Sequence, residues 1–520
     1  MCQSIGQMSQ RADDDMDGYL DSRCFPHLSI QKWIPTCLRV CVGMPMRPLD
    51  RMLVLMAAMP VFGQGPAVTP DHPWHSPVER QIASEAQRLG QSGFRIEADK
   101  IYSLAELVDL AEAHNPQTRV AWESARAQAA GLGIARSELY PTLTAVALMG
   151  VDRSEIPLGT RFYRFTIPAF EASLELNYTI LDFGARRGRI DAASARVLAA
   201  NFGFNDVHRK LIYEVQQAYY RLLNASAQET AARSSLANAQ AVQQAAEERL
   251  KNGLATLPDV LEARSATAQA QYDLQAVLGA EQVARGDLAT ALGTSASATI
   301  HVQPLNEVPT PESVGETVAQ VIDRALSQRP DLQTKVADIR EANSQAKEAR
   351  AAYYPTLGLH ASPAVQSLFS QQQNLPWGHT TDLTGGVGLS LNWTVFDGGA
   401  RKNRLAQAQA QIRQSEAQAS ATRDEIEDEV WTAYSNLNTA FRQREAATAL
   451  LDASSQSYAA ALESYNYGVR NLLDVTASQK VLAQARSADI LARTQVLATL
   501  SDLAFRAADS IQTVQKGSHP

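Results

Sequence analysis

Apolar and polar residues alternate along two stretches of the 520-residue chain, near 171–180 and 387–395. The apolar positions are Ala172, Leu174, Leu176, Tyr178 and Ile180 in the first stretch, and Val387, Leu389, Leu391, Trp393 and Val395 in the second. Most residues between them are polar, so each stretch predicts a strand with one apolar and one polar face. An ordinary soluble antiparallel strand would show the same alternation. A length of about 9 to 11 residues, with an aromatic residue near one end, also fits a tilted membrane strand.

Helical periodicity precedes and follows these strands. The segments 104–139 and 318–352 each predict one helix, ended by a Tyr-Pro pair because proline disfavours the α conformation in the residue before it. No proline occurs between Ala185 and about Asn252, which at about 1.5 Å per residue predicts roughly 100 Å of helix. Apolar residues spaced by four and three form a seam typical of coiled coils, although an Ala-rich soluble bundle would show it too. They are Leu211, Val215, Ala218 and Leu222, then Ile426, Val430, Ala433 and Leu437.

The chain repeats itself with a constant shift of 214 or 215 residues. Tyr140-Pro141-Thr142-Leu143 recurs as Tyr354-Pro355-Thr356-Leu357, Glu214-Val215 recurs as Glu429-Val430, and Gly253 recurs as Gly468. One register held over so many elements predicts a tandem duplication. We expect a first repeat at 103–300, a second at 314–510, and between them a linker at 301–313 that contains three prolines.

The segment 46–63 reads as a basic region, a short apolar region and a small-residue cleavage site, which predicts a signal peptide. We therefore interpret 1–45 as an upstream extension from a misplaced start, with Met44 or Met46 as the true start. Segment 64–102 would be a periplasmic N-terminal segment, and 511–520 a C-terminal tail. All four cysteines fall within the first 41 residues, which leaves a body suited to an oxidising compartment.

No apolar run reaches the roughly 20 residues of a membrane-spanning helix, so a bilayer would have to be crossed by strands. Each alternating strand is expected to pair with a weaker one before it, near 143–151 or 357–365, where Pro363 weakens the second prediction. The segments between, 152–168 and 366–382, are expected to be outward-facing loops. Because an open four-stranded sheet leaves unsatisfied edges in lipid, the barrel would close between chains, with about twelve strands from three copies.

The chain resembles the TolC-type outer-membrane efflux channels over about Leu104 to Asp509. The resemblance rests on the Tyr-Pro-Thr-Leu motifs, the turns Asp182-Phe183-Gly184 and Asp397-Gly398-Gly399, and two hairpin tips near Gly253 and Gly468. It implies a mainly α protein with β structure: a homotrimeric 12-stranded transmembrane β-barrel, four strands per protomer, continuous with a long α-helical periplasmic barrel. Such a protein would be the passive exit duct of a tripartite efflux or secretion system in the cell outer membrane. Its partners would be outer-membrane lipid, a periplasmic adaptor (membrane fusion) protein and an inner-membrane pump.

The candidate site is the pair of hairpin tips, which the resemblance implies is the periplasmic gate. By resemblance, Tyr465 and Arg470 tie the inner hairpin, Asp259 is a tying partner, and Asp474 contributes to an acidic ring at the narrowest point. From the residues alone, Asp259 and Asp474 would equally be first-turn carboxylates favoured by a helix dipole. The chain departs from the family at two positions, Pro258 and Ala477. The expected adaptor contacts are Gly253, Leu254, Gly468 and Val469.

Charge and motif content exclude other classes. A formal net charge of −8 without a basic cluster argues against nucleic acid. The nine histidines are scattered and no metal-ligand or phosphate-loop spacing occurs, so we expect no enzyme, cofactor or metal. Asp13, Asp15 and Asp17 match half of a calcium loop, but Cys24 stands where a glutamate is needed. The alternative is a secreted coiled-coil structural or adhesion protein, which would explain the helices and export but not the duplicated strands.

Overall fold

The computed structural model describes residues 71, 78–89, 96–97, 100–303, 317–372 and 375–509. The expected extension 1–45, signal peptide 46–63 and tail 511–520 lie outside this range, as does most of the linker. The chain divides into two units at Ser92. The first contains the exposed helix α3, Glu79–Leu89, and the second contains every other described element.

Corresponding helices of the two halves of the second unit have equal lengths. They are α4 (Leu104–His114) and α8 (Val318–Gln328), of 11 residues; α5 (Pro116–Ser137) and α9 (Pro330–Ala351), of 22; α6 (Ala185–Lys251) and α10 (Ala400–Asn466), of 67; and α7 (Leu257–Ala291) and α11 (Leu472–Arg506), of 35. The predicted long helix after Ala185 is confirmed to within a residue.

The prediction of one continuous helix at 104–139 and another at 318–352 is wrong, because each segment forms two helices. The breaks fall at Asn115-Pro116 and Arg329-Pro330, where proline occupies the first helical position. Asn115 (ψ 128°) and Arg329 (ψ 123°) are extended, as a residue before proline prefers. Both second helices end just before the Tyr-Pro pairs, as predicted.

All of the long strands belong to one antiparallel sheet. They are β2 (Thr142–Leu158), β3 (Arg161–Leu181), β5 (Thr356–Ala361), β6 (Ala364–Gln372), β7 (Gly378–Thr384) and β8 (Val387–Asn392). Both β5 and β6 pair with β3. On their other sides, β5 pairs with β8 and β6 pairs with β7. The six segments therefore form four continuous strand paths, with β2 at one edge and β7 and β8 at the other.

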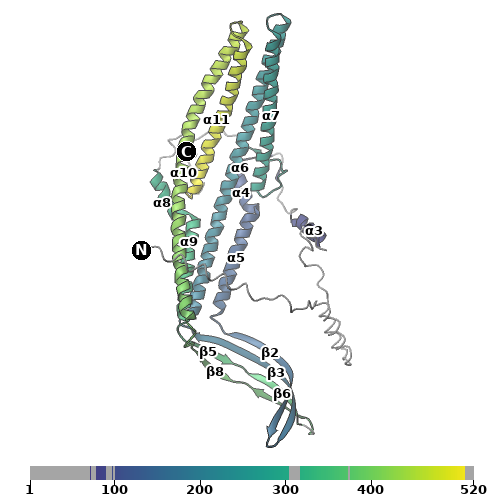
Figure 1. Cartoon of the computed structure of the whole chain (residues 1–520), viewed down its shortest axis with the longest axis vertical. Coiled ribbons are helices and arrows are strands. Elements are labelled where there is room, and N and C mark those ends of the chain that lie inside the picture. The colour runs from purple at the N-terminus through teal and green to yellow at the C-terminus, as the bar shows by residue number, and fades with distance from the viewer. Residues whose placement is uncertain are drawn as a thin grey trace, which may run out of the picture. The chain divides into compact units, whose positions relative to one another are not determined.

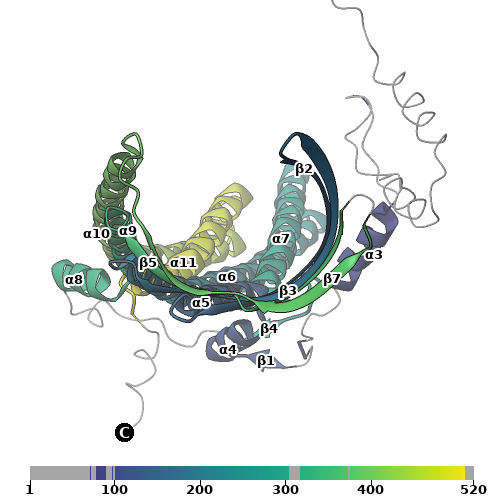
Figure 2. The ribbon, with the colours of Figure 1, turned by 90° about the horizontal axis from the view of Figure 1, so that it is seen from below.

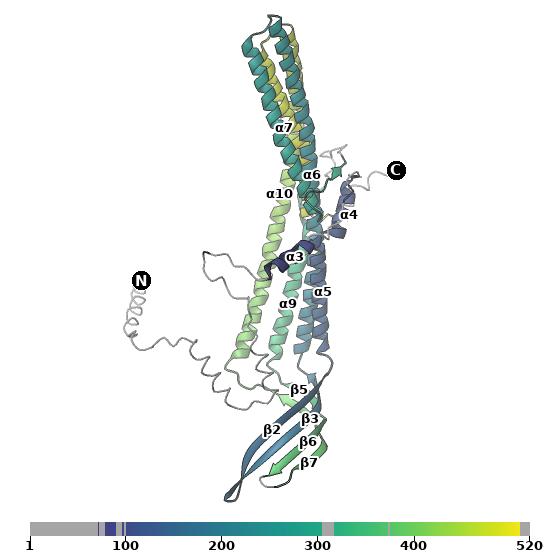
Figure 3. The same ribbon diagram turned by 90° about the vertical axis from the view of Figure 1, so that its right-hand side faces the viewer.

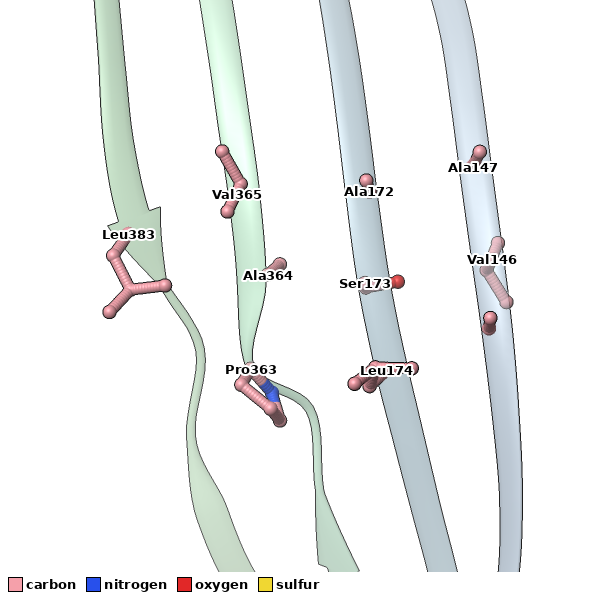
Figure 4. A pocket seen from close by; sticks show the side chains of 10 residues that line it. Val146, Ala147, Ala172, Ser173, Leu174, Pro363, Ala364, Val365 and Leu383 are labelled. Atoms are coloured by element: carbon pink, nitrogen blue, oxygen red, sulfur yellow. The ribbon is translucent and has the colours of Figure 1, made fainter.

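Pro363 interrupts the third path and Gly385 the fourth, at facing positions. Gly385 has φ 136°, and a Cβ atom there would clash with the Ser362 carbonyl oxygen, so only glycine fits. Pro363 still accepts a hydrogen bond from the Leu174 N–H at 2.9 Å, and the Ser362 N–H donates to the Gly386 carbonyl oxygen. Figure 4 shows the side chains that line an apolar groove on the sheet around this interruption. The ladder continues past the proline without a shift of register, because Ala361 and Ala364 keep partners three residues apart on both neighbouring strands.

The expected outward loops 152–168 and 366–382 are mostly strand. β2 and β3 continue to a tight turn at Gly159 and carry an ion pair between Glu155 and Arg164 at 3.0 Å. The sequence pattern missed this extension because charged residues and prolines interrupt the regular alternation that predicts a half-buried strand.

The register gathers like residues on each face of the sheet. Leu176 lies opposite Leu143, Leu174 opposite Ala145, and Leu389 opposite Leu359, whereas Glu175 lies opposite Thr144. The predicted apolar and polar faces are therefore continuous across neighbouring strands. The sheet is strongly curved (Figure 2).

In this unit the sheet lies at one end of the long helices and the hairpin tips lie at the other (Figures 1 and 3). The predicted seam is buried: Leu211, Val215 and Leu222 belong to one core and Ile426, Val430 and Leu437 to another. Near the first core, the two-residue strands β1 (Ile101–Tyr102) and β4 (His301–Val302) pair in parallel.

Candidate functional site: the hairpin tips

Glycine turns end both long helices. The Leu254 N–H donates to the Arg249 carbonyl oxygen at 2.8 Å, and the Val469 N–H donates to the Ser464 carbonyl oxygen at 2.9 Å. Gly253 (φ 71°) and Gly468 (φ 75°) take the left-handed conformation that this closing motif needs. The return helices α7 and α11 begin at Leu257 and Leu472, as the sequence predicted.

The side chains just beyond the two glycines point into solvent. Leu254 is 68% exposed and Val469 79% exposed. Each tip therefore presents an exposed apolar side chain that no described residue of the chain covers.

Asp259 and Asp474 occupy the same position in the two return helices but differ in their contacts. The Asp259 carboxylate accepts hydrogen bonds from the Thr256 hydroxyl at 2.7 Å and the Thr256 N–H at 2.8 Å, which lower the pKa of Asp259. The Asp474 backbone N–H, by contrast, donates a hydrogen bond to the side-chain oxygen of the N-cap residue Asn471 at 2.9 Å. The Asp474 carboxylate forms no ion pair within the described residues. Asp259 thus acts as a helix-capping carboxylate, while that of Asp474 remains available.

Tyr465 is part of the core that joins the two tips. It is 5% exposed and packs with Val242, Ala246 and Val260 of the first hairpin and Leu472 of its own. Its hydroxyl group is buried and has no hydrogen-bond partner. Burial raises the pKa of Tyr465; the nearby Arg249 opposes this increase and the nearby Asp259 reinforces it.

Arg470 is exposed and forms no ion pair with any described residue. The chain therefore brings Tyr465 and Asp259 near one another but leaves Arg470 outside that cluster.

Arg249 is a tip residue whose role the sequence did not indicate. Its Nη1 donates to the carbonyl oxygens of Tyr465 at 3.0 Å and Asn466 at 3.3 Å, and its guanidinium lies 4.6 Å from the centre of the Tyr465 ring. Arg249, in the last turn of α6, therefore supplies hydrogen bonds to the unpaired carbonyl groups at the end of α10, and it holds the two hairpins together. A basic residue in the last turn of a helix is common, so only the fold could reveal this contact.

A second charged cluster lies where α11 ends, far along the chain from the tips. Arg329 contacts Asp331 and, at 2.6 Å, Glu429, and Arg506 also contacts Glu429. The equivalent joint of the first half is neutral, because there the Asn115 side chain donates to the Ala291 carbonyl oxygen. The two halves thus have different joints at the base of their hairpins.

Across the described ranges no three His, Cys, Asp or Glu side chains are grouped to hold a metal ion. None of the helices in those ranges has both the length and the apolar character to cross a membrane.

Long paired helices joined to a curved antiparallel sheet define a class of outer-membrane proteins, and the comparisons agree. The sequence profile of the family described as "Outer membrane efflux protein" matches residues 107–294 and 321–507. The chain therefore belongs to this family: it is an outer membrane efflux protein with the mainly helical fold and β-sheet portion that the resemblance predicted.

Individual relatives span most of the chain. Protein CyaE of Bordetella pertussis is 28% identical over 78% of this chain and 85% of its own length. Outer membrane protein OprJ of Pseudomonas aeruginosa is 26% identical over 85% of this chain and 90% of its own.

Among solved structures, a membrane protein from Pseudomonas aeruginosa aligns with a TM-score of 0.69 at 25% identity, covering 81% of this chain and 99% of that one. The outer-membrane channel OprN aligns with a TM-score of 0.70 at 20% identity, covering 81% and 95%.

Proposed function

We propose that three copies of this chain form one closed barrel of about twelve strands, and that this trimer is the passive exit duct of a tripartite efflux or secretion system. The observation that carries the proposal is the open sheet. Four strand paths leave β2 and the β7–β8 path without partners, and one face of the sheet is apolar. An edge in lipid would leave backbone groups unsatisfied, so both edges need strands from other copies.

The duct is gated at the tips. Closure combines contacts within a chain, around Tyr465 and Asp259, with contacts between copies. Arg470 would make contacts between copies, because it is exposed and forms no ion pair with the described residues of its own chain. Asp474 presents a free carboxylate, which threefold symmetry would repeat as an acidic ring that favours cations.

The partners are a periplasmic adaptor protein and an inner-membrane pump, which supplies the energy. The adaptor contacts are Gly253, Leu254, Gly468 and Val469, whose turns are solvent-exposed in the single chain.

The chain is organised as two repeats, 103–300 and 314–510, joined by a linker at 301–313. The equal lengths of corresponding helices and the double match to the family profile support this division. Export uses the leader 46–63 after the extension 1–45, and N-terminal sequencing of the exported protein should begin near Gln64. A mature protein that retains Cys24 or Cys41 would contradict this processing.

The test of the duct is to purify the protein from outer membranes, measure its mass in detergent and record single-channel currents in planar bilayers. A trimer with heat-modifiable migration and discrete conductance steps is the expected result. A monomer, or a trimer without conductance, would contradict the proposal.

A further inference from the structure

Within one chain, α6 of the first half packs along α11 of the second. Polar contacts along the pair fix its register. The Ser501 hydroxyl donates to the side-chain oxygen of Gln216. The side-chain amide of Gln217 donates to the Ala498 carbonyl oxygen (3.0 Å), and that of Gln228 donates to the Ser487 carbonyl oxygen (2.9 Å). In the opposite direction, the side-chain amide of Gln479 donates to the Ser235 carbonyl oxygen (3.5 Å). The α6–α11 contact is therefore a defined pairing of residues.

The other long helices, α10 and α7, follow the same numbering with a shift of 215 residues. Each has the same length as its counterpart, and the buried positions Leu211, Val215 and Leu222 of α6 recur as Ile426, Val430 and Leu437 of α10. For every residue in the α6–α11 contact, the equivalent position on α10 or α7 is therefore known.

The exposed large apolar side chains of α7 and α10 all occupy such equivalent positions. They are Leu257 (59% exposed), Leu261 (53%), Tyr272 (73%) and Val283 (65%) on α7, and Trp431 (57%) and Leu450 (47%) on α10. Their counterparts on α11 and α6 are Leu472, Thr476, Ser487, Ala498, Gln216 and Ser235. Three of these counterparts, Leu472, Thr476 and Gln216, are at most 9% exposed, and the other three accept hydrogen bonds across the pair. The face that is covered in one pair is open and apolar in the other.

We infer that α10 of one copy packs against α7 of a neighbouring copy in the register of the α6–α11 contact. This inference rests on the proposed trimer and names the residues that would meet in it. Trp431 lies opposite Gly286 of the neighbouring copy, as Gln216 lies opposite Ser501 within a chain. A Cβ atom at Gly286 would lie 3.6 Å from the Ala296 carbonyl oxygen of its own chain, which is an ordinary contact, so a cysteine can be placed at this position.

The same register places Asp428 opposite Asp287 of the neighbouring copy. Their counterparts within a chain are Tyr213 and Asp502, where the tyrosine hydroxyl donates to the carboxylate at 2.9 Å. Two carboxylates cannot form that bond and repel each other, so this position weakens the contact between copies and gives a second way to test the register.

The test uses the full chain with its four native cysteines replaced by serine. Trp431→Cys combined with Gly286→Cys should, on oxidation, give covalently linked trimers on a denaturing gel. The matched pair Gln216→Cys with Ser501→Cys should link only within a chain and leave the mass unchanged. The out-of-register pair Trp431→Cys with Tyr272→Cys should not link copies.

The trimer itself is measured separately, by mass in detergent, so that the two proposals fail separately. A trimer that the first pair does not link, or that the out-of-register pair links equally well, overturns the register but leaves the duct in place. A monomer overturns both.

Asp428→Tyr provides an independent measurement without cysteines. This variant places a tyrosine opposite Asp287 of the neighbouring copy, as Tyr213 lies opposite Asp502 within a chain. It should raise the temperature at which the trimer dissociates above that of both the parent protein and Asp428→Asn. A variant that dissociates at or below the temperature of Asp428→Asn would overturn the register.

Discussion

Arg329 donates a hydrogen bond to Glu429 at 2.6 Å, although the two residues are 100 positions apart. The Arg329 side chain is 5% exposed, and Glu429 also accepts from Arg506 at the end of α11. Burial opposes the charge of Arg329, but its hydrogen bonds to Asp331 and Glu429 outweigh this and raise the pKa of Arg329. One carboxylate therefore ties the break between α8 and α9 to both helices of the second hairpin.

Glu429→Gln should destabilise this joint by about 1.5 to 3 kcal/mol, because it weakens charge-assisted hydrogen bonds from two arginines. Glu214→Gln, at the equivalent position of the first half, is the matched control, since Glu214 has no ion pair within the described residues. Denaturant unfolding gives both values. Equal losses for the two variants would show that the joint does not depend on this carboxylate.

Acid should weaken the same joint through Asp331. Burial raises the pKa of Asp331, but hydrogen bonding from Arg329 and the charge of Arg209 outweigh it, so the pKa lies below its ordinary value. The contribution of Asp331 is therefore complete above about pH 4, the unfolded value, and is lost as the pH falls through the lower folded value. Unfolding free energies measured from pH 6 to pH 2 should fall less steeply for Asp331→Asn than for the parent protein. Parallel curves would contradict the assignment.

Arg249→Ala should loosen the two tips from each other, because it removes two hydrogen bonds and the contact with the Tyr465 ring. We expect a higher single-channel conductance and faster proteolysis at the tips. Lys251→Ala removes an exposed cation from the same helical turn and should change neither. If the two variants behave alike, the clamp does not hold the closed state.

Replacing Arg470 with Ser should also raise conductance, since a closed–open balance of a few kcal/mol shifts when a modest contact between copies is lost. Asp474→Ala should instead abolish block by trivalent cations and leave closure intact. Block that persists in Asp474→Ala would place the acidic ring elsewhere.

The two faces of the sheet should respond differently to charge. Leu174→Arg and Leu389→Arg on the apolar face should each cost about 2 to 4 kcal/mol near the bilayer midplane. Glu175→Arg and Ser390→Arg on the polar face should mainly alter conductance. Heat-modifiable migration reports the first effect and bilayer recordings the second, and equal costs on both faces would refute the assignment.

The sequence predicted those features that depend on neighbouring residues. A proline-free run starting at Ala185 and a glycine after the last turn define a long helix and its end wherever the rest of the chain lies. The break at Asn115-Pro116 carried a local signal too, a capping residue before proline, but the apolar periodicity continued across it and hid the break. The interruption at Pro363 needed knowledge of the facing strand, because the matching glycine is Gly385.

Most of the site depended on contacts between distant segments. Arg249 and Tyr465 are 216 residues apart, and no periodicity within either helix indicates that they meet. The same holds for Arg329 and Glu429. The bond between Thr256 and Asp259 is the exception, because the two residues are three positions apart and form a capping box, a pattern that is visible in the sequence.

The length of β3 has a practical consequence for the outside of the cell. Its 21 residues are roughly twice the number that a tilted strand needs to cross a bilayer. In the proposed barrel, the outer part of the β2–β3 ribbon would therefore stand clear of the lipid as a stiff rod, held by its ladder and by the Glu155–Arg164 pair. The turn at Gly159 would be carried away from both the duct and the helices. A short foreign peptide grafted at this turn should be displayed to antibodies on living cells without disturbing export.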